Sequence, residues 1–399
     1  MQNLAFFNAI LKEDYLGPIR EQLNSSTVLL RRLKRNEEDV GGRIAQVPLH
    51  VGRNAGVGAR ADGGALPAAG RQTYTNAQFL TAYNYGRIQV TGPTIAASRK
   101  DKYAFVKAVD SEIKGMVRDL KDDLNRQLFG DRSAVLAVVT TANTAGGSTF
   151  VVDNAQYLQT GMVIDAVSHT PPAAPVINRA NVTIIAVDRN TKTVTVQGTL
   201  ATGEAPVGAR IARNGNYGLE MMGLRGVVGV GNTRDGQFVG GLDRTLTQNA
   251  FWRANVLGNG GTLRALTLDL MQHAFDASEI EGGEVSLIIT SYEQRRRYLT
   301  LLKQDNRFVN TLKLDGGFEA LEYNGKPLVV DRHMPPNGIY FLDESTLQLY
   351  RMSDFNWMDQ DGSVLSRVAN ADAYEATLFK YATLGCSNCN NNTILTDLS

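Results

Sequence analysis

The spacing of hydrophobic residues changes along the chain, and each change marks a new segment. Between residues 15 and 35 an apolar stripe recurs at helical intervals, which predicts a helix with Pro18 in its first turn. Basic residues and then acidic residues follow. We interpret them as a solvated helix end, because cations are favoured near C-terminal carbonyls. They are Arg31, Arg32, Lys34 and Arg35, then Glu37, Glu38 and Asp39.

Two alternating stretches enclose a segment that is poor in large hydrophobic residues. Residues 43–51 and 72–90 alternate apolar and polar positions, as strands do. Between them, residues 52–70 are mostly Gly, Ala and Arg and cannot form a core of their own. We therefore predict an extended hairpin that projects from the body. Isolated hairpins are marginal in water, so this arm needs a surface to lie on, and a neighbouring subunit would supply it.

The next segment, residues 96–130, has the pattern of a long one-sided helix. Ser98 and Asp101 resemble a capping box, and Gly130 is a C-terminal stop. At 1.5 Å per residue this helix is about 45 Å long, and it should pack along a sheet. Its apolar stripe consists of Val106, Val109, Ile113, Met116, Val117, Leu120, Leu124 and Leu128.

Short strands separated by turns follow in residues 131–217, which predicts an inserted β-barrel or β-sandwich domain. The predicted strands are residues 135–139, 149–152, 162–167, 182–187, 193–197 and 207–212.

The remaining part contains segments with helical spacing of apolar residues and segments with strand-like alternation, so the predicted fold class of the chain is α+β. The predicted helices are residues 263–277 and 292–303. The predicted strands are residues 285–290, 328–331, 338–342, 347–350, 364–367 and 373–384.

Composition and charge narrow the function classes. The 41 basic and 40 acidic residues give a net charge of +1, whereas proteins that hold nucleic acid over a long tract are usually basic. This balance argues against tight DNA binding by the whole surface and suits a protein packed beside its own copies. We expect no membrane span and no secretory signal, because no long apolar run and no basic N-terminal region occur. The protein should be made and used in the cytosol.

We find no constellation of residues that indicates catalysis, a cofactor or a metal. The histidines His50, His169, His273 and His333 are isolated from each other and from metal-type partners. The glycines at 229, 231 and 236 have the wrong spacing for a dinucleotide fingerprint, and Gly325-Lys326 is followed by Pro327 rather than Ser or Thr. We expect a protein that is not an enzyme.

The two cysteines, Cys386 and Cys389, are the only pair of close sulfur ligands. They could form half of a zinc site, a redox pair or a disulfide. A zinc site needs four ligands, so two subunits would have to share one ion. We favour two thiols in a polar C-terminal tail.

Several stretches of the C-terminal half, taken in order, fit the pattern of a known family. They are residues 249–256 (NAFWRANV), Gly260-Gly261-Thr262, Gly282-Gly283, residues 295–297 (RRR), residues 323–331 (YNGKPLVVD) and residues 339–343 (IYFLD). With the preceding order of arm, hairpin, long helix and α+β body, the chain resembles the major capsid proteins of tailed bacteriophages. Their Hong Kong phage-type fold is shared with encapsulins. The resemblance covers nearly the whole chain outside residues 131–217.

The resemblance implies a division into named parts. These are an N-terminal arm (1–40), an E-loop hairpin (41–95), a spine helix of the peripheral domain (96–130), the inserted β domain (131–217), a connector (218–262), an axial domain (263–350), and peripheral-domain strands with the C-terminal tail (351–399).

The resemblance also implies a function. The chain would be a structural subunit that self-assembles into pentamers and hexamers of an icosahedral shell around double-stranded DNA. It would reside in the virion after assembly in the bacterial host cytoplasm. Its partners would be other copies, a portal, a candidate decoration protein and DNA through weak non-specific contact, with no membrane.

Two departures from the family pattern carry predictions. Some relatives join a lysine of the E-loop to a neighbour's asparagine, but here no lysine lies between Lys34 and Lys100. Arginine stays protonated and is a poor nucleophile, so we predict no isopeptide cross-link through the hairpin. The sequence has no long segment before the arm, so the resemblance implies a separate scaffolding protein or none.

Opposite charges in two regions suggest how copies meet. Residues 41–92 contain five arginines and one acid, which gives +4, and residues 352–399 contain two bases and six acids, which gives −4. We hypothesise that the basic hairpin docks on an acidic region of its neighbour. The alternative is that these charges are only solvated. The candidate contact residues are Arg53, Arg60 and Arg71 on the hairpin, and Asp354, Asp359 and Asp361 on the acidic region.

The sequence leaves three other classes of protein open. An encapsulin-like compartment would have the same fold but would enclose protein cargo. An enzyme with a β insertion would need a concave site with convergent polar groups. A receptor-binding or tail tube protein would lack the long helix.

Overall fold

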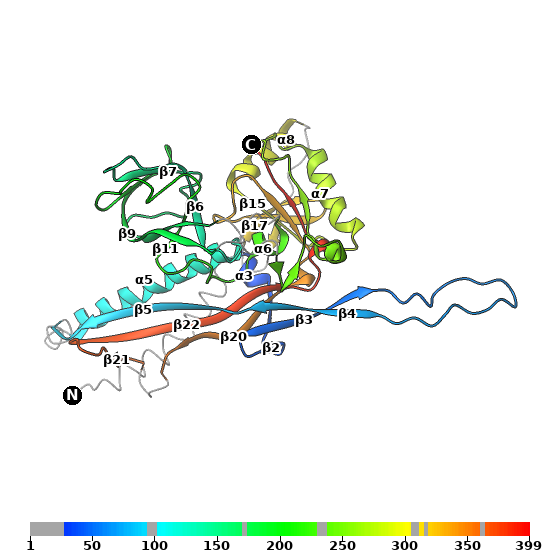
Figure 1. The fold of residues 1–399 in the computed structure, drawn as a ribbon, viewed down its shortest axis with the longest axis horizontal. Coiled ribbons are helices and arrows are strands. Elements are labelled where there is room, and N and C mark those ends of the chain that lie inside the picture. The colour runs from blue at the N-terminus through cyan, green and yellow to red at the C-terminus, as the bar shows by residue number, and fades with distance from the viewer. Residues whose placement is uncertain are drawn as a thin grey trace.

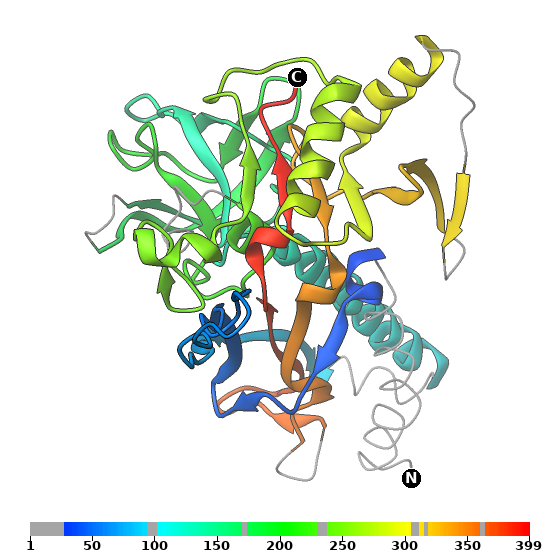
Figure 2. The same cartoon turned by 90° about the vertical axis from the view of Figure 1, so that its right-hand side faces the viewer.

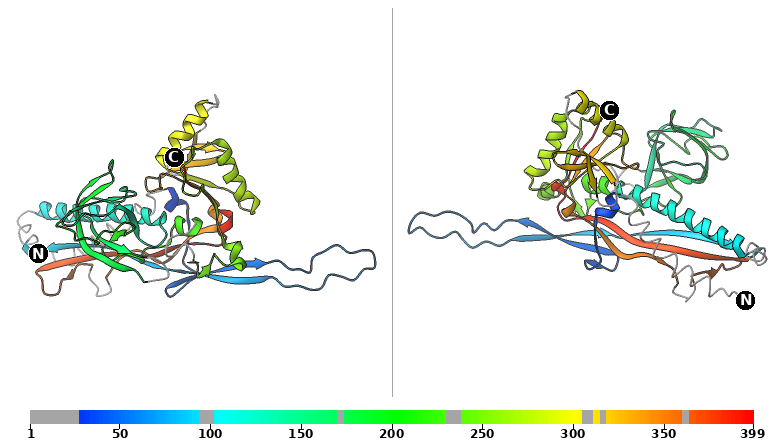
Figure 3. Two further views of the ribbon diagram at one scale, coloured as in Figure 1. Left: turned by 45° about the horizontal axis from the view of Figure 1, so that its top comes forward. Right: turned by 180° about the vertical axis from the view of Figure 1, so that it is seen from behind.

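A long, narrow sheet forms the base of the molecule, and the other parts stand on it or extend from it. The computed structural model describes residues 28–93, 102–169, 174–229, 238–304, 311–314, 318–359 and 364–399. Figure 1 shows a long helix lying along the sheet, a barrel and an α/β body above it, and a hairpin that extends far beyond the body. The reverse view in Figure 3 shows the same arrangement.

The long sheet joins segments from both ends of the chain. Its order is β1-β20-β22-β21, with β5 also paired to β22. Strands β5 and β22 pair antiparallel along their whole common length, from Ala82 opposite Ala382 to Thr91 opposite Ala373. The strands are β1 (Lys34–Asn36), β5 (Ala82–Thr91), β20 (Leu347–Trp357), β21 (Ser366–Arg367) and β22 (Ala373–Cys386).

The described end of the N-terminal arm differs from the prediction. Helix α3 covers only Val28–Arg32, and Lys34–Asn36 then form β1, which pairs parallel with β20. The predicted helix over residues 15–35 is therefore wrong at its C-terminal end, and residues 15–27 lie outside the described part of the chain. Of the basic run, Arg31, Lys34 and Arg35 are exposed as expected, but Lys34 and Arg35 belong to a strand and Arg32 is paired. Both Nε and Nη2 of Arg32 donate to the carboxylate of Glu344 at 2.6 Å, and the strand that follows gains a neighbour in β20.

The predicted hairpin is present, but its second strand is divided. Strands β3 (Ile44–Gly52) and β4 (Thr73–Leu80) pair antiparallel, with β2 (Val40–Gly41) beside β3. We predicted one strand over residues 72–90. Instead the chain breaks at Thr81, where the backbone N–H and the hydroxyl both donate to the carbonyl oxygen of Arg43. Beyond this point the chain leaves the hairpin and joins the long sheet as β5.

The long helix α5 (Lys102–Leu128) packs on β5, close to the predicted position. Its 27 residues give a length of about 40 Å. The glycine at position 86 of β5 allows close approach, because an added Cβ would lie 3.1 Å from the side chain of Met116. The predicted capping pair Ser98 and Asp101 lies outside the described residues. Five of the predicted stripe residues are buried: Ile113, Val117, Leu120, Leu124 and Leu128.

The inserted domain is a closed barrel rather than a sandwich, with the order β10-β7-β6-β11-β8-β9. Its interior is filled by aliphatic side chains and Phe150. Strand β9 starts earlier than predicted, because residues 176–179 pair with the end of β8. The strands are β6 (Val135–Thr141), β7 (Thr149–Val152), β8 (Val163–Ser168), β9 (Val176–Asp188), β10 (Thr193–Val196) and β11 (Arg210–Arg213).

The α/β body contains a seven-stranded sheet of order β14-β23-β19-β15-β18-β17-β16. Figure 2 shows its helices, yellow-green to yellow, beside the red C-terminal strand. Helix α7 begins at Leu268 and not at residue 263, because the hydroxyl of Thr267 caps it. The helices are α7 (Leu268–Ile280) and α8 (Tyr292–Gln304). The strands are β14 (Asn255–Leu257), β15 (Leu287–Thr290), β16 (Thr311–Leu314), β17 (Phe318–Tyr323), β18 (Lys326–Val330), β19 (Ile339–Leu342) and β23 (Thr393–Leu395).

Two strands of this sheet, β14 and β23, come from segments that the sequence assigns to other parts of the molecule. Strand β14 belongs to the predicted connector, and β23 belongs to the predicted peripheral tail. Both belong to the α/β body, where β23 pairs with β14 on one side and with β19 on the other. Strands β16 and β17 were not predicted. Short elements complete the fold: α6 (Leu224–Val228), β12 (Phe238–Val239), β13 (Leu242–Asp243), and the 3-10 turns Thr247–Trp252, Glu344–Thr346 and Cys389–Asn391.

Candidate functional site

The hairpin carries its arginines into solvent, away from the body. Arg53, Arg60 and Arg71 lie in the strandless tip between β3 and β4, and all three are exposed. Arg60 folds back on the tip, where its Nε donates to the carbonyl oxygen of Ala65 at 3.0 Å. None of the three forms an ion pair with any residue that the structure describes. The described residues therefore leave the positive charge of these three arginines without an ion-pair partner.

The acidic residues that we predicted as their receptor are placed differently. The carboxylate of Asp354 accepts from Arg351 at 2.6 Å and from Lys380 at 3.2 Å, so its charge is compensated within its own chain. Burial alone would raise the pKa of Asp354, but Lys380, the backbone N–H of Phe355 and Arg351 together outweigh it, and the pKa is lowered. Asp359 is half-buried and has contacts of its own, and Asp361 lies outside the described residues. The predicted docking of hairpin arginines on these acids stays a prediction.

A buried ionic network joins the long helix to the barrel. The Nη2 atom of Arg126 on α5 donates to Asp123 at 2.9 Å and to Glu220 at 2.5 Å. Arg213 at the end of β11 lies 3.3 Å from the same Asp123. Burial lowers the pKa of Arg126, but the attraction of Glu220 and Asp123 outweighs it and holds the guanidinium charged. The network fixes the base of the barrel on the C-terminal end of the helix.

A second contact ties the barrel to the α/β body. The hydroxyl of Tyr157 donates to the carbonyl oxygen of His333 at 2.6 Å, across 176 residues of sequence. Asn125 of α5 donates to Nδ1 of His333 at 2.7 Å and to Asp331 at 2.9 Å. Burial and the nearby Arg332 lower the pKa of His333 to about 4. The barrel is thus held at two points.

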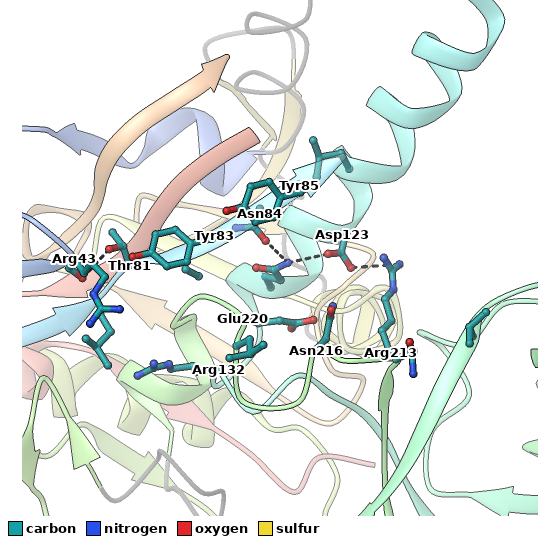
Figure 4. Close-up of a pocket in the computed structure, with 17 residues that line it drawn as sticks. Arg43, Thr81, Tyr83, Asn84, Tyr85, Asp123, Arg132, Arg213, Asn216 and Glu220 are labelled. Carbon is teal, nitrogen blue, oxygen red and sulfur yellow. Dashed lines mark hydrogen bonds and ion pairs between the residues drawn. The ribbon is translucent and has the colours of Figure 1, made fainter. Parts of the chain in front are cut away.

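A pocket of about 770 Å³ lies at the junction of the hairpin root, α5 and the barrel (Figure 4). Arg43 enters it from the hairpin root and Arg132 from the first residues of the barrel domain. In Figure 4, Asp123 and Arg213 lie on the other side of the view. The pocket holds both signs of charge, but no triad or metal cluster. Across the residues that the structure describes, no group of three or more metal-ligand side chains occurs.

The cysteines are not in a polar tail, so that interpretation was wrong. Both are fully buried, Cys386 at the end of β22 and Cys389 in the following 3-10 turn. They pack there because β23 continues the chain into the core of the α/β body. Burial raises the pKa of the Cys386 thiol well above its usual value. A zinc ion shared between subunits would need ligands at the surface, and these thiols are not there.

Of the remaining histidines, His273 is exposed on α7, and the other two contact neighbouring side chains. His50 contacts Gln72 across the hairpin, and Nδ1 of His169 lies 2.8 Å from the hydroxyl of Tyr217. In the part of the chain that the structure describes, no helix is long and apolar enough to cross a membrane.

Sequence reasoning missed the residues that join the parts. Arg126 and Glu220 are 94 positions apart and belong to no motif, and Arg126 looked like one of many charges on the solvent face of the helix. No spacing in the sequence marks Arg132 or Asn84 as pocket residues.

Comparisons with known proteins agree with the fold and supply a family. Residues 54–399 match the family described as SU10 major capsid protein. No match to a curated protein sequence was found. The cyanophage A-1(L) capsid asymmetric unit is 16% identical, with 92% of this chain and 90% of that chain covered and a TM-score of 0.55. This score shows a shared fold.

Two further solved structures are similar at lower scores. The SrpI encapsulin complex from Synechococcus elongatus is 10% identical, with 93% of this chain and 87% of that chain covered and a TM-score of 0.46. The Microbacterium phage Oxtober96 structure is 13% identical, with coverages of 93% and 90% and a TM-score of 0.45. The family match spans most of the chain and confirms the prediction from the sequence. The chain belongs to the SU10 major capsid protein family and is a structural, non-enzymatic shell protein of the bacteriophage virion.

Proposed function

We propose that the hairpin is the arm by which each copy holds the next one in pentamers and hexamers of an icosahedral shell. The observation that carries this proposal is the length of unsupported chain beyond β3 and β4 (Figure 1). Val57 and Leu66 in this tip are 83% and 86% exposed. Two strands with an open tip are marginal in water, and exposed apolar side chains on such an arm favour a partner surface.

The charges of the arm orient the contact more than they strengthen it. Each exposed ion pair contributes only about 0.2–1 kcal/mol, and complementary charge mainly selects the partner and its register. We propose the acidic region of the neighbouring copy that contains Asp354, Asp359 and Asp361 as the receptor. Weak contacts repeated over a shell also let misplaced copies leave.

Flexible segments would let one sequence occupy five-fold and six-fold positions. Among the described residues the candidate is the Gly-rich tip at 52–70. The other two candidates from the sequence, the N-terminal arm and the Gly-rich stretch at 223–241, lie partly outside the described residues. The barrel would stabilise the capsomer or face the exterior, and its two attachments to α5 and to the α/β body support a rigid role.

The shell would enclose double-stranded DNA through weak non-specific contact, in line with the net charge of +1. We further propose assembly in the bacterial host cytoplasm with a separate scaffolding protein, or none, together with a portal and a candidate decoration protein. An encapsulin-like compartment is the second candidate function. It would hold protein cargo in place of DNA.

Electron microscopy of the purified protein, expressed alone and with candidate scaffolds, tests the proposal. We expect closed shells or rings of five and six. Nuclease-protected DNA in shells from infected cells would distinguish a virion from a cargo compartment. A monodisperse small oligomer under every condition would contradict the proposal.

The hairpin charges can be tested separately. The double substitution Arg53→Glu with Arg60→Glu should prevent regular shells, because it reverses the charge of the arm. A matched control, Arg189→Glu with Lys192→Glu, reverses two charges on an exposed barrel turn and should assemble normally. Normal shells from the hairpin variant would exclude the charge-guided contact.

A further inference from the structure

The pocket at the hairpin root has hydrogen-bond donors without acceptors. Asn84 is 8% exposed, and its Nδ2 atom has no hydrogen-bond partner, while its Oδ1 atom accepts from Gln127 at 2.9 Å. The Nε atom of Arg213 is also buried without a partner. Both side chains line the pocket. Buried polar groups in folded proteins are nearly always paired, so each such donor in a pocket points to an acceptor that comes from outside.

Two further donors in the pocket are charged. Neither Arg43 nor Arg132 forms an ion pair or a side-chain hydrogen bond with any part of the chain that the structure describes. Arg132 also has a φ of 73°, a left-handed conformation that is uncommon for residues other than glycine. Strain of this kind is unfavourable and is concentrated at functional sites. The backbone at Arg132 thus holds a cation at the pocket wall against its own preference.

The carboxylates of the pocket do not compensate these cations. Asp123 and Glu220 both accept from Arg126, and Asp123 also lies 3.3 Å from Arg213. The unmet groups are all donors, and three of them belong to arginine side chains. The chemistry of the pocket is therefore that of an oxyanion site, and a ligand with two or more acceptor oxygens would satisfy it.

We propose that this pocket receives a carboxylate from a second copy of the chain, supplied by the acidic turn Glu37–Asp39. This inference rests on the proposed assembly through contacts between copies. The turn contains the chain's single run of three consecutive acids. All three side chains are exposed. The pocket volume of about 770 Å³ is large enough for a turn and not only for one carboxylate group.

Within the turn, Glu38 is the residue that can reach out. Glu37 pairs with Arg351, and the carboxylate of Asp39 accepts from Asn36 at 2.7 Å. The side chain of Glu38 has no partner among the described residues. Turn and pocket are different patches of one surface, so their contact would be head-to-tail, the arrangement that closes rings of copies. The hairpin tip is a poorer occupant, because it is basic.

The test uses a neutral variant and a matched control in the full-length protein. Arg43→Ala with Arg132→Asn removes both charges, and Asn tolerates the left-handed backbone at position 132. The control, Arg189→Ala with Lys192→Asn, removes two exposed charges from the barrel turn, and Lys192 is also left-handed with a φ of 55°. We expect the neutral variant to need a protein concentration at least about tenfold higher to form shells, while the control matches the wild type. Thermal unfolding of the unassembled proteins should be the same for both variants.

A charge exchange identifies the occupant. Arg132→Asp alone should prevent assembly, and Arg132→Asp combined with Glu38→Arg should restore shells. Failure of the exchange to restore a variant that remains folded would exclude the acidic turn as the occupant. Assembly of the neutral variant at the wild-type concentration would overturn the contact altogether.

Adding inorganic phosphate tests the other source of acceptor oxygens, which is a free anion and not a carboxylate of a second copy. If phosphate raises the melting temperature of the unassembled wild type but not that of the neutral variant, and the neutral variant still assembles normally, the pocket binds free anions and the inference is wrong. If the wild type itself forms no shells under any condition, the proposed function fails, which is a different result from a variant that fails alone.

Discussion

The Nζ atom of Lys380 lies 3.2 Å from Oδ1 of Asp354, between two neighbouring strands of the long sheet, and Lys380 is 2% exposed. The same ammonium lies 4.2 Å from the centre of the Phe355 ring. Burial lowers the pKa of Lys380 to about 8, although Asp354 opposes this shift. Burial removes the hydration of both charged groups, and their mutual attraction offsets this cost. Each partner therefore depends on the presence of the other.

Removing one partner of this pair should cost more than removing the other. Asp354→Asn removes the carboxylate that lies 3.2 Å from the buried Nζ of Lys380 and should lower the free energy of unfolding by about 3–5 kcal/mol. Lys380→Met leaves Asp354 with Arg351 and keeps an apolar stem, so the loss should be smaller. Urea unfolding of the unassembled protein at neutral pH measures both. Equal losses of unfolding free energy in the two variants would show that Arg351 alone does not compensate the charge of Asp354.

Acid should weaken the contact between the barrel and the α/β body through His333. Its pKa is about 4 in the folded protein, and the usual value is about 6.5. The unfolded chain therefore binds more protons between these values, and stability falls as the pH drops through that window. The loss at pH 4.5 should be about 2–3 kcal/mol, and His333→Gln should remove it. His273→Gln on the exposed face of α7 should keep the wild-type response, and the comparison uses unfolding free energies at pH 7 and 4.5.

Two glycines at the long helix should respond in opposite directions to alanine. A Cβ at Gly223 would lie 2.3 Å from the carbonyl oxygen of Gln127 and 2.7 Å from that of Leu128, at the C-terminal end of α5. Gly223→Ala should cost about 1–3 kcal/mol or more, because backbone atoms must move. Gly115→Ala, inside α5 with no atom within 4 Å of the new Cβ, should instead stabilise by about 0.5–1 kcal/mol. Thermal unfolding of both variants measures the two changes in stability. Changes in the same direction would contradict the described packing.

The two thiols should be protected in the folded chain. Because Cys386 and Cys389 are fully buried, a thiol reagent should modify them only when the C-terminal segment opens. We expect the thiols of the folded protein to be modified at a rate at least about 100-fold below that of the unfolded protein. The variant Ala61→Cys, in the exposed hairpin tip, supplies a thiol that should react at once under the same conditions. Immediate reaction of all thiols would place the cysteines at the surface.

Local periodicity was enough to locate most elements of this protein. The helix over Lys102–Leu128, the hairpin and the barrel strands follow from apolar spacing and from turn residues, which act over a few positions. The family followed from the order of these elements together with short stretches such as residues 323–331.

Periodicity could not say which strands pair. Residues 72–90 have one continuous alternating pattern, yet the chain changes sheets at Thr81, because the partner of β5 is β22, almost 300 positions later. The C-terminal residues 393–395 read as a tail, but they form a strand of the α/β sheet that is paired on both sides, with β14 and with β19. Pairing depends on which edge is free in the folded chain, and that information is not local.

The same limit applies to charge. The sequence by itself determined the fold class, the projecting arginine-rich hairpin and the absence of a catalytic motif. Only the tertiary structure decided that Arg126 and Asp354 are compensated inside the chain, while Arg43 and Arg132 have no ion-pair partner among the described residues. The reason is physical: a charge in a sequence has no fixed energy until its neighbours and its exposure to water are set, and distant segments set both.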